Sequence, residues 1–229
     1  MLLSKIIEGR KTVYSRGASS DDIRLSSRYI YDIFLDNRNR VISQKKNKKQ
    51  FIADYNYEIL ECVDMIEVSS IECSSLAHMG CTIKRSKEPI PEALSYENGL
   101  MIDWIMDFYN KEIPLQDKRR VKYQTANRYV KNDFVCVIEN NYLYITSKYA
   151  PNKVKVKLIA YNPLEVRLKG CISAMEVDFP LQGSERDAVL QMTDQEIMGV
   201  FSTNREDRQN DSREQANIYQ KPDNKDDKN

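Results

Sequence analysis

The chain has one histidine and seven glycines among 229 residues, and both shortages limit the chemistry that it can carry. Any catalytic pair built on histidine would have to use His78, whose neighbours are typical of a loop before a strand. No glycine has the spacing of a phosphate-binding loop, and no HExxH or GxSxG motif occurs. These absences argue against an enzyme and predict a chain that needs no cofactor.

Net charge and long apolar runs are also missing. Lysine and arginine (35) balance aspartate and glutamate (34), so the formal net charge of +1 argues against nucleic acid as the main partner. No apolar run approaches the roughly 20 residues of a membrane helix, and no signal peptide is visible. We therefore expect a soluble protein, made in a cytoplasm, with no membrane partner. Five cysteines, an odd number, fit a reducing compartment with free thiols.

Two helices are predicted at the N-terminus, and together they would form a hairpin. The apolar residues of the first are Leu2, Leu3, Ile6, Ile7 and Tyr14. The second is expected to begin at Ser19, because Ser19-x-x-Asp22 has the form of a capping box. Its apolar face would consist of Ile23, Ile30, Phe34 and Val41, with Tyr29, Ile33 and Ile42 beside them. A basic run follows at Lys45, Lys46, Lys48 and Lys49, and it suits the C-terminal end of a helix dipole.

The middle of the chain is typical of short antiparallel strands. Residues 58–68 and 80–86 mix apolar and polar residues in short steps. Residues 133–138 and 142–146 form the clearest hairpin pattern, with a turn predicted at Glu139, Asn140 and Asn141. Val154, Val156 and Leu158 alternate with lysines, which predicts a strand with one solvent-facing side. We expect a small antiparallel sheet or a small sandwich.

The C-terminal part predicts one more helix and a polar tail. Residues 185–201 carry a moderate apolar stripe, whereas residues 203–229 have too few apolar side chains to offset the entropy of ordering. We expect that tail to be disordered unless a partner orders it. The candidate partner-binding residues are Val189, Met192, Ile197, Val200, Phe201, Ile218 and Tyr219. The predicted fold class is α+β. Its predicted parts are a helical region (1–50), a β-rich region (51–183), a C-terminal helix (184–202) and a flexible tail (203–229).

Two local clusters keep other functions open. Cys73-x4-His78-x2-Cys81, with Cys62 as a fourth ligand, offers the thiolates and imidazole that zinc binds, although the spacing departs from the usual paired pattern. Free thiols are the simpler interpretation, and a disulfide between Cys73 and Cys81 would need an oxidising setting. Residues 118–123 form a basic patch with one tyrosine, which could contact a nucleic-acid backbone together with the basic N-terminal helix. A surface loop or a subunit contact explains this patch better, because no net positive charge lies behind it.

The order of several segments resembles the head–tail connector proteins of short-tailed bacteriophages, especially the ring or adaptor proteins of crAss-like phages. The matching stretches are DDIRLSSRYI (21–30) with NRNRVISQK (37–45), IEC (71–73) with GCTIKRSKEPIP (80–91), NNYLYI (140–145), VKVKLI (154–159) and DFPL (178–181). Residues 99–128 fit the pattern less well, since MIDWIMD (101–107) is more apolar than the resemblance leads us to expect. None of these stretches is a catalytic signature, so the resemblance supplies no active-site residues.

The resemblance implies a structural role in the virion. Such proteins combine a helical bundle with a β-rich part and form a ring, commonly of twelve copies, below the portal. The expected partners are therefore copies of this chain, the portal protein and the next ring or tail protein, with phage DNA passing through the channel. We expect residues 185–229 to contact the portal or the next ring.

Overall fold

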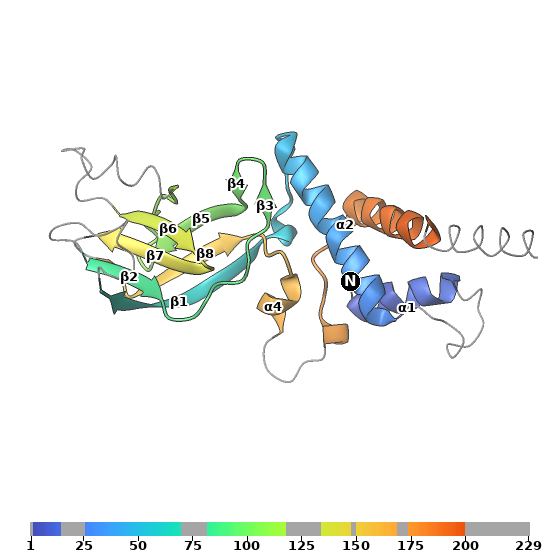
Figure 1. Cartoon of the computed structure of the whole chain (residues 1–229), viewed down its shortest axis with the longest axis horizontal. Coiled ribbons are helices and arrows are strands. Elements are labelled where there is room, and N and C mark those ends of the chain that lie inside the picture. Colours follow the sequence, from blue (N-terminus) through green and yellow to red (C-terminus); the bar gives the residue numbers. More distant parts are fainter. Residues whose placement is uncertain are drawn as a thin grey trace, which may run out of the picture.

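The computed structural model describes residues 2–14, 26–69, 82–117, 134–147, 150–168 and 174–199. The helices gather at one end of an elongated molecule and the strands at the other (Figure 1). In chain order the elements are α1 (Leu3–Tyr14), α2 (Ser27–Asn47), the 3₁₀ turn η2 (Asp54–Asn56), β1 (Glu58–Val68), β2 (Thr82–Ser86), β3 (Ser95–Tyr96), β4 (Gly99–Leu100), β5 (Ile102–Asp107), β6 (Val135–Glu139), β7 (Tyr142–Ser147), β8 (Lys153–Leu158), α4 (Pro163–Arg167), the 3₁₀ turn η3 (Ala174–Glu176) and a C-terminal helix at residues 183–199. The α+β class is confirmed. Among the described helices, none has both the length and the apolar content that crossing a bilayer requires.

The two N-terminal helices are confirmed, but the predicted start of the second is wrong. Ser26 has extended backbone angles, and its hydroxyl accepts a hydrogen bond from the Tyr29 backbone N–H at 3.1 Å, so Ser26 caps α2. α2 therefore begins at Ser27 and not at Ser19, and both the Ser19 to Asp22 box and Ile23 lie outside the described residues. Serine and aspartate cap well wherever they precede a helix, so the correct cap among several candidates depends on where packing begins.

Six strands form one antiparallel sheet in the order β5-β8-β1-β2-β7-β6. The four predicted strand regions appear as β1, β2, the β6–β7 hairpin and β8. Asn140 and Asn141 have φ values of 52° and 62°, and this left-handed pair makes the two-residue turn that matches the twist of the hairpin. Of these six strands, β5 is the one that the sequence patterns did not predict, and the short pair β3–β4 outside this sheet was not predicted either. The pairing of β5 with β8 shifts register between Ile102 and Trp104, and the bulge breaks the alternation that marks a strand.

The sheet curls until its two edge strands are linked by residues 111–117. Ile113 N–H donates to the carbonyl of Ile105 in β5 at 2.7 Å, and Gln116 N–H donates to the carbonyl of Cys136 in β6 at 2.9 Å. The curled sheet therefore encloses its own apolar core, which includes Met65, Ile105, Ile113, Cys136, Leu143, Ile145, Val154, Val156 and Leu158. One closed sheet, rather than two stacked sheets, provides the hydrophobic interior.

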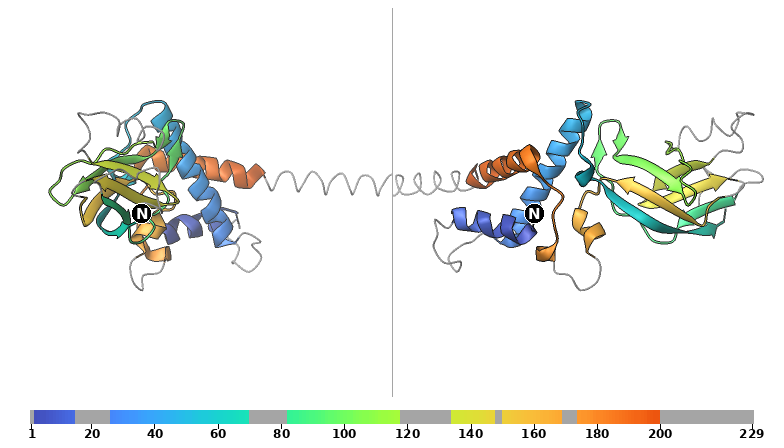
Figure 2. Two further views of the ribbon diagram at one scale, coloured as in Figure 1. Left: turned by 60° about the vertical axis from the view of Figure 1, so that its left-hand side comes forward. Right: turned by 180° about the vertical axis from the view of Figure 1, so that it is seen from behind.

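A second core lies between the helices. It contains Leu3, Ile6 and Ile7 of α1, Ile30, Phe34 and Leu35 of α2, Leu164 of α4, Val177, Phe179 and Leu181, and Val189 and Ile197 of the C-terminal helix. The predicted β-rich range 51–183 thus contributes to the helical core as well. A smaller cluster of Ile42, Ile52, Leu94, Met101 and Ile159 joins the two ends, and the views in Figure 2 show the helices grouped beside the sheet from both directions.

Candidate functional site

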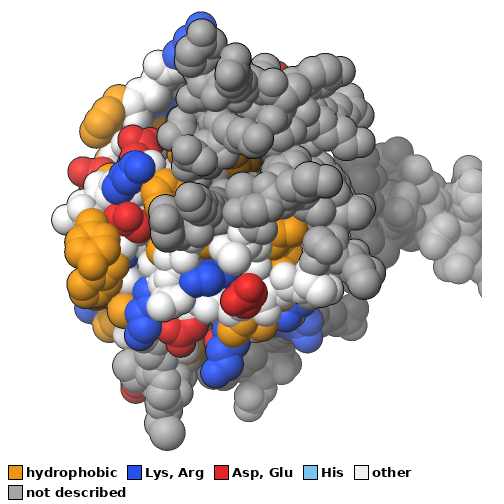
Figure 3. Space-filling model, turned by 90° about the vertical axis from the view of Figure 1, so that its left-hand side faces the viewer, with side chains coloured by type: hydrophobic (Ala, Val, Ile, Leu, Met, Phe, Trp, Pro, Cys, Tyr) orange, Lys and Arg blue, Asp and Glu red, His pale blue; other side chains and the backbone are white. Residues whose placement is uncertain are grey.

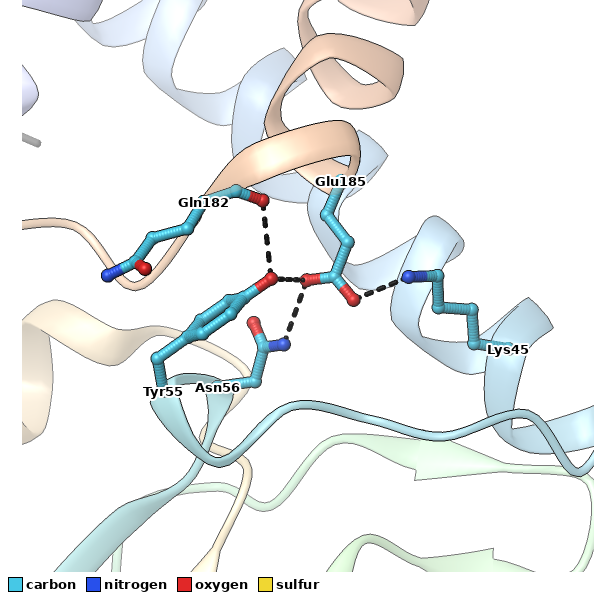
Figure 4. Close-up of polar contacts among 5 residues, drawn as sticks. All are labelled: Lys45, Tyr55, Asn56, Gln182 and Glu185. Atoms are coloured by element: carbon cyan, nitrogen blue, oxygen red, sulfur yellow. Dashed lines mark hydrogen bonds and ion pairs between the residues drawn. The ribbon is translucent and has the colours of Figure 1, made fainter.

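A buried carboxylate, Glu185, joins three elements at the junction of the helical and sheet ends. It lies in the first turn of the C-terminal helix and accepts hydrogen bonds from Lys45 Nζ at 2.5 Å, Tyr55 Oη at 2.6 Å and Asn56 Nδ2 at 2.9 Å. Lys45 comes from the last turn of α2, and the other two come from η2 before β1, so all three donors point at one carboxylate (Figure 4). The Tyr55 hydroxyl also contacts the backbone carbonyl of Gln182 at 3.2 Å. This polar junction holds the helices at a set position on the sheet.

The hydrogen bonds decide the ionisation of the junction. Burial alone would raise the pKa of Glu185, but the donors Asn56, Lys45 and Tyr55 outweigh it and hold that pKa below its usual value. Burial and the bond to Glu185 raise the pKa of Tyr55 to about 12, so its hydroxyl remains a donor. The junction therefore contains an ionised carboxylate at neutral pH.

The depressed pKa of Glu185 predicts how stability depends on pH. The carboxylate contributes fully above the unfolded-state pKa of about 4.3, and its contribution is lost as pH falls through the lower folded-state value. Glu185→Gln removes the charge, so we expect it to lower the free energy of unfolding by roughly 2 kcal/mol at neutral pH. The difference from the wild type should shrink steadily as the solution is acidified, which urea unfolding at a series of pH values measures. A difference that stays constant with pH would contradict the assignment, and the exposed Glu8→Gln variant is the control.

Two arginines extend the junction into the helical core and the sheet. Arg38 of α2 is fully buried, and its Nη1 donates to Asn39 Oδ1 at 3.0 Å and to the carbonyl of Ala160 at 3.2 Å. Burial lowers the pKa of Arg38 to about 10. Arg167 of α4 donates from Nε to Glu58 Oε1 at 2.7 Å, which ties α4 to the start of β1. Burial raises the pKa of Glu58, and Arg167 offsets only part of that rise.

A groove runs between β1 and the segment that follows β2; we call it the β1 groove. Its volume is about 740 Å³. One wall is formed by β1 residues that include Ile59, Cys62 and Val63, and the other by residues 87–91. Cys62 is exposed there as a free thiol. The groove is open to solvent.

An aromatic turn projects from the end of β5 that lies away from the helices. Phe108 and Tyr109 are 68% and 88% exposed, with their rings edge to face at a centroid distance of 6.3 Å. Asp107 Oδ1 accepts the backbone N–H groups of Tyr109 and Lys111, each at 2.8 Å, so the turn has a defined shape. Figure 3 looks onto the sheet end and shows hydrophobic side chains gathered at one rim beside charged ones. Exposed aromatic side chains in a well-defined turn suit contact with another protein.

The structure separates the predicted partner-binding residues into groups. Val189 and Ile197 are buried against α1 and α2, and Met192 is half-buried, so most of this stripe packs within the chain. Met198, 57% exposed on the same helix, was not singled out from the sequence. The other four candidates, Val200, Phe201, Ile218 and Tyr219, lie outside the described residues. Their role stays a prediction.

The zinc and nucleic-acid candidates are placed only in part. Cys73, His78 and Cys81 lie outside the described residues, and within the described ranges no three metal-binding side chains come together. The basic patch at 118–123 also lies outside them. In the basic run that ends α2, Lys45 is paired with Glu185, and the Lys46 ammonium lies 5.7 Å from the centre of the Tyr96 ring. These two lysines therefore serve contacts within the chain.

Sequence reasoning missed the residues of the junction, although one signal was present. Arg38 lies four residues after Phe34 and eight after Ile30, so it continues the buried stripe of α2. A charged residue at such a position predicts a buried polar contact. Glu185 gave no comparable signal, because its partners lie more than 120 residues away.

Comparison with known proteins gives a consistent result. Ring protein 2 of Bacteroides phage crAss001 is 28% identical over 149 residues, which are 64% of this chain and 63% of that protein. The match thus spans a little less than two thirds of the relative's length. A family model described as phage tail ring protein 2 matches residues 12–228. Because this match covers nearly the whole sequence, and the resemblance found from the residues is confirmed, the chain belongs to the phage tail ring protein 2 family.

Proposed function

We propose that copies of this chain form a ring in the head–tail connector of the virion, below the portal, and line the channel through which DNA leaves the head. The family match over residues 12–228 carries this proposal. A phage tail ring protein is a structural component of the virion and associates with copies of itself. The function of the chain would then be assembly, through contacts made by its exposed surfaces.

The geometry supports ring formation for a physical reason. A ring closes only if each subunit is rotated by the same angle relative to the previous one. Each subunit therefore needs two different lateral faces whose relative orientation is constant. The helical end and the sheet end are chemically different, and the junction at Glu185 holds one against the other. The aromatic turn at Phe108 and Tyr109 offers an exposed contact at the sheet end.

We place twelve copies in the ring, with the portal protein on one side and the next ring or tail protein on the other. The residues after the C-terminal helix, including Phe201, Ile218 and Tyr219, would contact one of these neighbours. Segments that become ordered on binding are suited to such contacts.

Mass spectrometry and cryo-electron microscopy of particles of the phage that encodes this chain test the proposal. We expect the chain in intact virions, at a dozen copies below the portal, with density for residues 203–229 on a neighbouring protein. Its absence from particles, with abundance only in infected cells, would overturn the connector assignment. A ring elsewhere in the tail would keep the family role and refute the position.

A further inference from the structure

The β1 groove contains a strand edge that is available for pairing. Residues 59–63 of β1 lie beside β8 on one side, whereas pairing with β2 on the other side begins only at Met65. Among the described residues no strand occupies that second side of 59–63. An unpaired strand edge is a template on which another extended chain can form backbone hydrogen bonds.

The opposite wall of the groove cannot complete the pairing. Pro89 and Pro91 have no backbone N–H, and the N–H of Ile90 already donates to the carbonyl of Asn141 at 2.7 Å. A chain entering the groove would therefore form its ladder with β1 alone. The pairing between β1 and β8 also shifts register between Leu60 and Val63, so the bulged residues Glu61 and Cys62 lie exposed at this edge.

The lining of the groove is mostly acidic, and this favours a basic occupant. The charged lining residues are four acids, Glu61, Asp64, Glu88 and Glu165, and one base, Lys87. Lys153 Nζ lies 3.4 Å from Asp64 Oδ1, but both side chains are about half exposed. This ion pair therefore offsets little of the negative potential in the groove. An extended segment with several basic residues is the complementary occupant.

One segment of this chain has that composition. Residues 118–133 (KRRVKYQTANRYVKND) contain six basic residues and one acidic residue. Val121, Tyr123 and Thr125 alternate with Lys122 and Gln124, which is the pattern of a strand with one apolar and one polar side. The apolar side would meet the apolar groove residues, and the lysine and arginine side chains would meet the carboxylates.

We propose that residues 118–133 of one copy occupy the β1 groove of the neighbouring copy by adding a strand to β1. The inference rests on the proposed ring, because a heterologous ring contact needs two different, complementary surfaces on each subunit. Each copy would contribute one groove and one basic strand. The contact repeats around the ring and leaves no groove empty.

Cross-linking to the native thiol of Cys62 tests the contact directly. In a full-length background with Cys73, Cys81 and Cys171 replaced by serine, single cysteines are introduced at positions 121 to 125 in turn. Rings of this chain are isolated from particles, oxidised and run on a non-reducing gel. We expect covalent links between copies, strong at alternate positions, because successive side chains of a strand point to opposite faces.

The outcomes separate this inference from the proposed function. Rings that are present but show no link to Cys62, or a link confined to one chain, would overturn the groove contact and leave the ring intact. Absence of rings of this chain from particles would overturn the proposed function. Equal linking at a control cysteine in place of Glu97, which lies outside the groove, would show that the reaction is nonspecific and would also refute the contact.

Charge reversal gives an independent measurement. Glu61→Lys with Glu88→Lys should raise the dissociation constant between subunits by roughly tenfold or more. The reason is that the new lysines would face the basic residues 118–133 of the neighbouring copy. The matched control is Glu67→Lys with Glu97→Lys, which changes two exposed acids outside the groove. Both pairs should keep the wild-type circular dichroism spectrum. Adding Arg120→Glu and Lys122→Glu should restore association of the first pair. Equal association of both lysine pairs would refute the proposal.

Discussion

Replacing Phe179 by alanine should lower the free energy of unfolding by about 3–5 kcal/mol, as truncation of a buried aromatic residue usually does. Phe179 is 2% exposed in the helical core. Its ring centre lies 5.1 Å from that of Phe34 and 6.3 Å from that of Tyr31, and the Arg38 guanidinium lies 5.7 Å from it. The variant would leave a cavity beside α2 in the helical core and would take away the apolar cover of the buried Arg38 guanidinium. Urea unfolding followed by circular dichroism measures the loss.

A second phenylalanine supplies the control for this experiment. Phe108 is 68% exposed in the aromatic turn, so Phe108→Ala should change the free energy of unfolding by no more than about 0.5 kcal/mol. Phe179→Leu, which keeps part of the volume, should fall between the two. A loss for Phe179→Ala that is as small as that for Phe108→Ala would mean that the helical core does not depend on this contact.

Replacing Glu185 by alanine should lower the free energy of unfolding by about 3–5 kcal/mol, because the donors that converge on this buried carboxylate would lose their acceptor. Asn56 is fully buried, and Lys45 would keep its charge with no acceptor in place of Glu185. The helices would lose the polar link that Glu185 makes to η2 and α2, so amide hydrogen exchange should quicken at η2 and at the end of α2. Denaturant unfolding and hydrogen exchange check both expectations.

A compensating variant separates the stranded charge from the lost packing. Glu185→Leu combined with Lys45→Met removes both charges and keeps apolar volume, so it should recover a large part of the stability that Glu185→Ala loses. The exposed Glu176→Ala should leave stability unchanged within about 0.5 kcal/mol. If the double replacement is no better than Glu185→Ala, the ionic contact itself, and not the stranded lysine, is what the junction requires.

Local patterns in the sequence predicted most of the strands and helices. The Asn140–Asn141 turn between two alternating segments identified the β6–β7 hairpin, and the Val-Lys alternation identified β8. Both signals depend on neighbours a few residues apart, which is why they are readable without the fold. β5 escaped because a bulge breaks its alternation, and the α2 cap was misplaced because several serines and aspartates could serve.

The candidate site was less predictable than the fold. Val189 and Ile197 form an apolar stripe that fits a partner surface or a core equally well, and the structure buries both within the chain. The β1 groove depends on where the pairing of β1 with β2 stops, and no local pattern marks that point. The resemblance to connector proteins predicted the family, but it could not identify the contact surfaces.

By itself the sequence determined the α+β class, the hairpin, the lysine-rich strand and the family, because each depends on short-range periodicity or on the order of segments. Tertiary structure alone decided that Glu185 meets Lys45 from 140 positions away and that residues 111–117 close the sheet. It also decided that no strand among the described residues pairs with the second side of β1 at 59–63. The reason is physical. Helix and turn propensities act between neighbours along the chain, whereas burial, ion pairing and strand edges depend on which distant segments come together in space.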